Sequence, residues 1–212
     1  MSRFVVVTGL PASGKSTVAV AVAKRLRLPL LDKDEILEAL FDSLGVGSGE
    51  WRRQLSGTAD LVLQQRSMQT RGAVLVSWWR HPESAVASGT SPSWLQSLPG
   101  EIIELHCGCG RGVAAERFAR RRRHPGHLDA QPEGERLQKF EGFVWPGALG
   151  IGRLVELNIE QPVDLEALFE RLEAPAGNPS TEPTVAGKPP VASHAPCQAR
   201  PSAGGEPCRS EH

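Results

Sequence analysis

The sequence predicts a three-layer α/β fold built on a five-stranded parallel sheet. Short apolar runs, which are typical of buried parallel strands, alternate along the chain with helical patterns. A glycine-rich segment separates the first apolar run from the first helical pattern. The chain has 212 residues, of which 40% are hydrophobic and 23% are charged, so it is long enough for one globular domain with a sizeable core.

The glycine-rich segment, residues 9–17, follows the strand-like run at residues 4–7 and fits the Walker A pattern G-x-x-x-x-G-K-[ST]. Its glycines let the backbone fold around an anion, so that successive N–H groups point at the anion at the start of a helix. Lys15 supplies charge to the β- and γ-phosphates, and the Ser16 hydroxyl is a ligand for Mg²⁺. The expected phosphate-binding residues are Gly9, Pro11, Ala12, Ser13, Gly14, Lys15, Ser16 and Thr17. The segment predicts a P-loop NTPase fold.

The next elements bring carboxylates to the same edge of the sheet. A helical pattern runs from Val18 and ends before Pro29, and residues 28–31 form a second strand. Asp32 and Asp34 follow this strand at its carboxyl end, where open α/β sheets bind their ligands. A further helix covers residues 36–41, so Asp34 either caps that helix or takes part in chemistry. The residues alone leave both interpretations open.

The third strand, residues 73–77, ends at Ser77, where many P-loop enzymes have an acid that holds the Mg²⁺ shell. Another carboxylate must then complete the shell, and Asp32 or Asp34 is nearest by topology. We expect Ser16 and Asp32 to be the metal ligands. The residues that follow, 78–81, either line a substrate pocket or pack in the core.

Two helices of different character flank this region. The first covers about residues 50–69 after a glycine-rich loop, and we expect its Arg52, Arg53 and Arg66 to lie in solvent. The second follows an irregular loop at residues 84–99 and a fourth strand at residues 101–106. It begins at Val113, runs into a cluster of arginines and stops at residues 124–127; the arginines are Arg117, Arg120, Arg121, Arg122 and Arg123.

Three interpretations fit the arginine cluster. It is a solvated helix end, a lid that closes over a triphosphate, or a nucleic-acid contact. We favour the lid, because the cluster follows the fourth strand of a P-loop fold. The 24 basic and 24 acidic residues of the chain cancel, which does not favour nucleic acid.

The chain closes with a short helix at residues 132–143, a fifth strand at residues 154–159 and a helix at residues 163–172. We therefore expect a P-loop domain over residues 1–173. Residues 174–212 are rich in proline and poor in large apolar side chains, so we expect a disordered tail. Neither a signal peptide pattern nor a membrane-length apolar run is present, which predicts a cytoplasmic protein without a membrane partner. The sequence indicates no oligomeric state.

Four segments together resemble the P-loop kinase family: residues 9–17, Asp32-Lys33-Asp34, residues 114–118 and Pro162-Val163-Asp164. Within it, residues 1–173 are similar to the small AAA-type predicted kinases that group with chloramphenicol phosphotransferase, zeta toxins and the kinase domain of polynucleotide kinase. The resemblance implies that an aspartate just after the second strand accepts the proton of the attacking hydroxyl; the match by position is Asp34, with Asp32 as the neighbouring possibility. It also implies that lid arginines, with Arg117, Arg120 and Arg121 as candidates, meet the phosphates.

The resulting hypothesis is an ATP-dependent phosphotransferase that uses Mg²⁺ and moves the γ-phosphoryl group to a hydroxyl of a small molecule. Its expected catalytic residues are Lys15, Asp34, Arg117 and Arg121. Two alternatives remain: a kinase for nucleic-acid 5′-hydroxyls, with Trp78 or Trp94 stacking on a base, and a nucleotide-binding regulatory module without transfer. Residues 45–53 and 78–94 should recognise the acceptor, but they contain no motif that identifies it.

Overall fold

The computed structural model describes residues 2–84, 88–129, 132–141 and 147–175, and these residues belong to one compact unit. The predicted tail at residues 174–212 lies outside these ranges except for its first two residues. The domain limits given above therefore stay a prediction.

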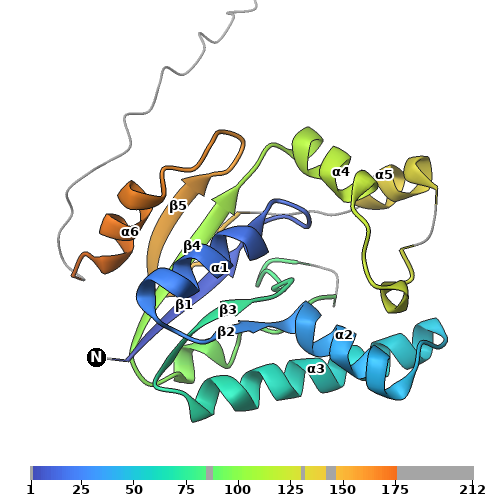
Figure 1. Cartoon of the computed structure of the whole chain (residues 1–212), viewed down its shortest axis with the longest axis horizontal. Coiled ribbons are helices and arrows are strands. Elements are labelled where there is room, and N and C mark those ends of the chain that lie inside the picture. Colours follow the sequence, from blue (N-terminus) through green and yellow to red (C-terminus); the bar gives the residue numbers. More distant parts are fainter. Residues whose placement is uncertain (1, 85–87, 130–131, 142–146, 176–212) are drawn as a thin grey trace, which may run out of the picture. The chain divides into compact units, whose positions relative to one another are not determined.

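The centre of the fold is a five-stranded sheet in the order β2-β3-β1-β4-β5, in which every pair of neighbours is parallel (Figure 1). The strands are β1 (Arg3–Thr8), β2 (Leu30–Asp32), β3 (Gly72–Val76), β4 (Glu101–Gly108) and β5 (Arg153–Asn158). β1 is the central strand, since Val5 pairs with Val74 of β3 and with Ile103 of β4. The predicted α/β class and the five-stranded parallel sheet are confirmed.

Helices cover both faces of this sheet (Figure 1). The α-helices are α1 (Lys15–Leu26), α2 (Lys33–Leu44), α3 (Gly49–Gln69), α4 (Arg111–Arg120), α5 (Glu133–Glu141) and α6 (Leu165–Glu173). Two short 3-10 turns, η1 (Leu95–Ser97) and η2 (Pro125–His127), lie between them. α1 and α6 pack on one face and α3 on the other, while α2 packs on α3 and α4 on α5.

The alternation of β1 side chains explains this layering. Val5 and Val7 pack into the core beneath α1 and α6, whereas Phe4 and Val6 pack on the face that α3 covers. All four are fully buried. Trp79 joins the second core, and its indole N–H donates to the carbonyl of Val7 at 3.0 Å. Of the two interpretations of residues 78–81, core packing therefore holds for Trp79.

The arginine cluster is less helical than the sequence predicted. α4 ends at Arg120, and Arg121 already has an extended backbone with φ −66° and ψ 144°. Pro125 keeps the residue before it, His124, out of the helical region, with φ −53° and ψ 136°, but the helix has already ended at Arg120. In extended backbone alternate side chains point the same way, so Arg121 and Arg123 share one side. Arg122 is exposed.

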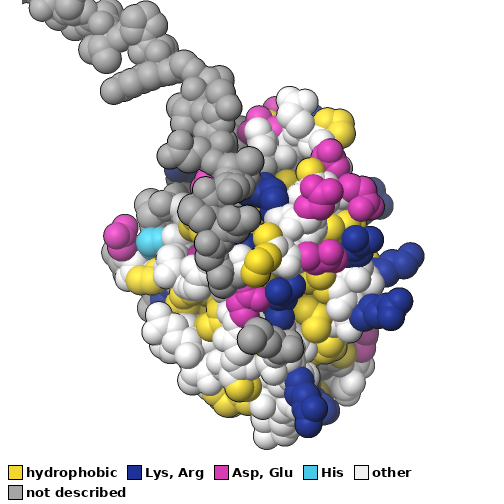
Figure 2. Space-filling model, turned by 90° about the vertical axis from the view of Figure 1, so that its left-hand side faces the viewer, with side chains coloured by type: hydrophobic (Ala, Val, Ile, Leu, Met, Phe, Trp, Pro, Cys, Tyr) yellow, Lys and Arg dark blue, Asp and Glu magenta, His cyan; other side chains and the backbone are white. Residues whose placement is uncertain are grey.

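No helix among the described residues combines the length and the apolar character needed to cross a bilayer. Figure 2 shows the face at the left of Figure 1, where Lys and Arg side chains lie among Asp and Glu side chains.

A buried carboxylate anchors the loop before β5. Glu104, on β4, is fully buried and accepts a hydrogen bond from the Thr8 hydroxyl at 2.9 Å. It also accepts from the backbone N–H groups of Leu149, Gly150 and Ile151 at 2.6, 2.9 and 3.2 Å. These donors replace the water that the carboxylate loses on burial. The loop is thus fixed against the centre of the sheet.

We predict that Glu104→Gln lowers the free energy of unfolding by about 2 to 4 kcal/mol, because the amide leaves buried N–H donors without an acceptor. Thermal and urea unfolding measure the loss, which corresponds to a fall in Tm of roughly 5 to 15 °C for a domain of this size. Glu156→Gln, the same change at an exposed position of β5, is the matched control and should shift stability by under about 0.5 kcal/mol. Equal effects of the two variants would contradict the anchoring role.

Candidate active site

A cavity of about 570 Å³ opens at the carboxyl edge of the sheet. It brings together the loop after β1, the end of β2, the first turn of α2, one face of α3 and the arginine segment, residues 117–129. The predicted site residues that line it are Pro11, Ala12, Gly14, Lys15, Ser16, Thr17, Asp32, Asp34, Arg117 and Arg121. Gly9 and Ser13 belong to the same loop but do not line the cavity.

The backbone of residues 9–17 has the form that a phosphate cradle requires. Gly9 has φ 137°, and a Cβ there would lie 2.5 Å from the carbonyl oxygen of Cys107, so only glycine fits. Gly14, with φ 102°, is the N-cap of α1 and turns the chain into the helix. The Ser13 hydroxyl is buried and has no hydrogen-bond partner among the described residues. The loop thus offers helix N-terminal N–H groups and an unused hydroxyl, a donor set that suits phosphate oxygens.

Lys15 lies over this loop. Its ammonium donates to the carbonyl oxygens of Gly9 and Leu10 at 3.1 and 2.7 Å. Desolvation by the surrounding protein lowers the pKa of Lys15 to about 8, although the nearby Cys107 and Asp34 act in the opposite direction. An anion bound to the ammonium would restore its charge.

Ser16 and Asp32 are in direct contact. The Ser16 hydroxyl donates to Asp32 Oδ2 at 2.9 Å, and Asp32 Oδ1 accepts from the backbone N–H of Asp34 at 2.9 Å. Burial raises the pKa of Asp32 to about 6, and the charge of Asp34 acts in the same direction. A hydroxyl and a desolvated carboxylate at the end of the P-loop are the oxygen ligands that Mg²⁺ prefers, so this pair fits the predicted metal site.

Asp34 is not the cap of α2, because Asp32 has that position. The Asp34 carboxylate instead forms an ion pair with Arg123, whose other amino group donates to Asp129 Oδ2 at 3.2 Å. The Asp34 side chain is 54% exposed, and that of Arg123 only 16%. Asp34 therefore faces the cavity with its charge oriented by the arginine segment.

The two arginines that the sequence singled out lie on different partners. Arg117 donates to the carbonyl oxygens of Ser13 at 3.2 Å and Ile159 at 3.4 Å, so its guanidinium rests on the phosphate loop. Arg121 stacks over the ring of Phe118 with 4.3 Å between the guanidinium carbon and the ring centroid, and lies 3.7 Å from Asp129. Both guanidinium groups line the cavity.

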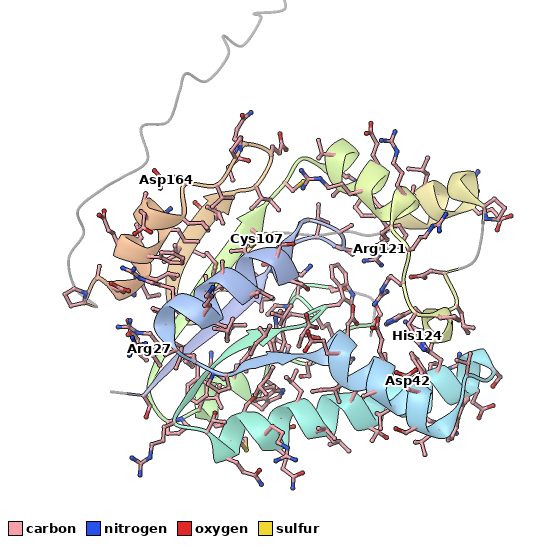
Figure 3. The ribbon with its side chains drawn as sticks, in the orientation of Figure 1. Arg27, Asp42, Cys107, Arg121, His124 and Asp164 are labelled. Carbon is pink, nitrogen blue, oxygen red and sulfur yellow. The ribbon has the colours of Figure 1, made fainter. Side chains whose placement is uncertain are left out.

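The arginine segment crosses from α4 to α2. Figure 3 shows His124 beside Asp42 of α2, and their Nε2 and Oδ1 atoms are 3.2 Å apart. The ring of His124 stacks on Phe41 at 5.4 Å, while His127 meets the edge of Phe41 and lies 2.8 Å from Glu38 Oε1. The segment is thus packed on α2 next to Asp34.

The Ser77 side chain forms a hydrogen bond that links two segments of the protein. Its hydroxyl contacts the Thr90 hydroxyl, which donates to Asp60 of α3 at 2.6 Å, so Ser77 is the donor to Thr90. Asp60 also pairs with Lys33 at 2.8 Å. This chain of contacts joins the end of β3 to α3 and to the first turn of α2.

The sequence interpretation did not select three cavity residues as site residues. Arg52 lies within residues 45–53, the range expected to recognise the acceptor, but we expected its side chain in solvent. That was wrong: it lies on the cavity face of α3, one turn before Ser56, because Leu55 and Ala59 turn the adjacent face into the core. Arg53 and Arg66 are exposed as expected. Arg123 and Asp129 also line the cavity and were not selected.

The aromatic residues of this region divide between cavity and core. Trp78 lines the cavity. Trp94 packs on the buried Trp79, with 6.1 Å between the ring centroids. The buried side of Trp94 is therefore engaged in the core beside α3.

Residues 4–90 match the model of a protein family described as AAA domain. The crystal structure of a candidate kinase from Chloroflexus aurantiacus is 28% identical over 80% of this chain and 96% of its own, with a TM-score of 0.65. This chain is therefore similar to an AAA domain over residues 4–90 and to a candidate kinase in its fold. The family match includes the phosphate loop, Asp32, Asp34 and Arg52, whereas the arginine segment lies beyond it.

Other solved structures are less similar to this chain. A sugar kinase from Janibacter sp. HTCC2649 is 20% identical over 81% of this chain and 92% of its own, with a TM-score of 0.47. The shikimate kinase from Acinetobacter baumannii, solved with shikimate, is 17% identical over 81% and 93%, with a TM-score of 0.49. Likeness at this level does not extend to the substrate. Among curated proteins no significant match is found.

We predict that nucleotide binding takes up protons near pH 8. In the free protein the pKa of Lys15 is about 8, and contact with phosphate should raise it. Each protein molecule that binds ATP should therefore take up about half a proton at pH 8 and almost none at pH 6.5, where Lys15 is already protonated. Calorimetric titration of ATP in two buffers of different ionisation enthalpy measures the uptake at each pH. Equal heats in both buffers at pH 8 would contradict the lowered pKa.

We predict that acid weakens the packing of His127. Burial and the charge of Arg123 lower the pKa of this imidazole below 6.5, while Asp34 and Glu38 act against them. The folded state therefore disfavours the protonated ring. The neutral ring contributes to stability above pH 6.5, and this contribution is lost as the pH falls through the lowered pKa of the folded state. Between pH 7.5 and 5, Tm should fall more for the wild type than for His127→Gln. Parallel curves for the wild type and His127→Gln would refute the prediction.

Proposed function

We propose that the protein is an ATP-dependent phosphotransferase that moves the γ-phosphoryl group to a hydroxyl of a small molecule. The observation that supports this proposal most directly is that one cavity is lined by the phosphate loop, the Ser16 and Asp32 pair, Asp34 and the arginine segment. The Chloroflexus aurantiacus structure, a candidate kinase, supports the same activity. Each part has a counterpart in phosphoryl transfer, which needs positioning and stabilisation of charge more than covalent chemistry.

The residues divide the work as follows. The backbone N–H groups of residues 9–17 and Lys15 bind the phosphates, and Arg117 and Arg121 lie where negative charge increases during transfer. Ser16 and Asp32 would hold Mg²⁺, which neutralises phosphate charge when bound. The Asp34 carboxylate accepts a hydrogen bond from the acceptor hydroxyl and orients it, then takes its proton as the new bond forms. Arg123 keeps this carboxylate in place.

The variants Lys15→Ala and Asp34→Asn should separate charge stabilisation from proton transfer. Lys15→Ala should reduce kcat/KM by at least about 1,000-fold, whereas Asp34→Asn should reduce kcat by about 100-fold and leave ATP binding intact. Transfer of labelled phosphate from ATP to a panel of hydroxyl compounds, together with ATP titrations, measures both. Lys24→Ala and Glu35→Gln, which change exposed neighbours of the same charge, should match the wild type.

The same experiments test the alternatives. Label that leaves ATP only for water, with tight ATP binding retained, would favour a regulatory nucleotide-binding module. Transfer to a 5′-hydroxyl oligonucleotide whose binding weakens steeply with salt would favour a nucleic-acid kinase. Lys15→Ala with wild-type activity would refute the phosphotransferase.

A further inference from the structure

Six basic side chains line the cavity: Lys15, Lys33, Arg52, Arg117, Arg121 and Arg123. Two of them rest on the phosphate loop, since Lys15 and Arg117 donate to its carbonyl oxygens. These two belong to the nucleotide side of the cavity.

Three of the remaining cations have carboxylate partners. Lys33 pairs with Asp60 at 2.8 Å. Arg121 lies 3.7 Å from Asp129, and Arg123 pairs with both Asp129 and Asp34. The protein therefore balances the charge of each of these side chains itself.

Arg52 differs from the other five. Its guanidinium has no hydrogen bond or ion pair with any described residue, and its Nε is closed off from solvent without a partner. A buried N–H donor without an acceptor is costly. Such a donor in a cavity indicates that the missing acceptor belongs to a ligand.

The position of Arg52 separates it from the nucleotide. It lies in the first turns of α3, a helix that supplies none of the phosphate loop and none of the arginine segment. Ser56, one turn further along α3, lines the same cavity, as do Trp78 and Ser88 from the region after β3. These side chains give the cavity hydroxyl groups and an aromatic surface in addition to the guanidinium, which is the composition of a small-molecule site.

We propose that the acceptor of phosphoryl transfer carries an anionic group, a carboxylate or a phosphate, and that Arg52 is its counter-ion. This inference rests on the proposed function. A guanidinium matches both anions because its parallel N–H groups bind two oxygens at once. With the anion held by Arg52 and a hydroxyl held by Asp34, a polyhydroxy compound is fixed at two points, which selects the hydroxyl that receives the phosphoryl group. Arg52 is thus a specificity-determining residue.

Matched acceptors test the proposal. The pairs are D-gluconate with D-glucitol, D-glycerate with glycerol, and D-glucose 6-phosphate with D-glucose, where the first two pairs probe a carboxylate and the third a phosphate. ADP release with saturating ATP gives kcat and KM for each compound. The wild type should prefer the anionic member of at least one pair by about 100-fold in kcat/KM.

Variants of Arg52 form the second part of the test. Arg52→Gln should lower kcat/KM for the preferred anionic acceptor by about 100-fold, mainly through KM, and change the neutral partner by under about 3-fold. Arg52→Lys should recover part of the loss, because it keeps the charge without the paired N–H groups. Arg53→Gln, an exposed neighbour outside the cavity, is the matched control and should behave as wild type.

A binding measurement distinguishes a failure of this inference from a failure of the proposed function. With a non-hydrolysable ATP analogue present, the preferred anionic compound should raise the Tm of the wild type and of Arg53→Gln, but not that of Arg52→Gln. Binding with this pattern but without transfer would contradict the phosphotransferase and leave the anion site intact. The proposal is overturned if no anionic member binds or reacts, if neutral members do equally well, or if Arg52→Gln weakens ATP binding instead.

Discussion

The contact between Ser16 and Asp32 determines the arrangement of the whole site. Asp32 uses one carboxylate oxygen for the Ser16 hydroxyl and the other for the backbone N–H of Asp34. One side chain therefore ties the phosphate loop after β1 to the start of α2. Because Asp32 also caps the N-terminus of α2, Asp34 does not have to cap the helix, and its side chain lines the cavity. The proposed metal site and the proposed acceptor site are thus positioned by a single carboxylate.

Topology makes this contact possible. β1 lies between β3 and β4, so the loop that follows it emerges at the middle of the carboxyl edge, where the connections to its two sides diverge. β2 lies one strand further out, which leaves room between the two loops for a ligand. The buried Glu104 holds the loop before β5 against the opposite side of β1 through Thr8. The phosphate loop and the end of β2, which both line the cavity, thus follow directly from strands of the central sheet.

The sequence predicts the parts of this structure that depend on local pattern. Continuous apolar runs predict the strands because a parallel strand is buried on both faces, and the glycine spacing predicts the phosphate loop because its backbone geometry needs those residues. Asp32 was selected as a metal ligand by its place after a strand. The raised pKa of Asp32 could not be predicted from the sequence, because the burial of a carboxylate depends on which distant residues pack over it.

The errors concern side chains whose surroundings come from distant segments. Arg52 looks like a solvated helix residue, because nothing within α3 shows that its face closes a cavity against α2 and the region after β3. The end of α4 was misplaced because arginines are good helix formers and favour a helix through residue 123, whereas the backbone already leaves the helical region at Arg121. In both cases a backbone or packing constraint outweighs local propensity.

The extended backbone of the arginine segment also bears on how Asp34 acts. Arg123 can reach Asp34 only because residues 121–124 are not helical, and His124 and His127 hold that segment on α2. The ion pair with Arg123 fixes the orientation of the Asp34 carboxylate. In the proposed reaction, where the transition state is loose, positioning of the attacking hydroxyl contributes more than covalent chemistry. The ion pair therefore favours Asp34 as the residue that orients this hydroxyl toward the phosphorus atom.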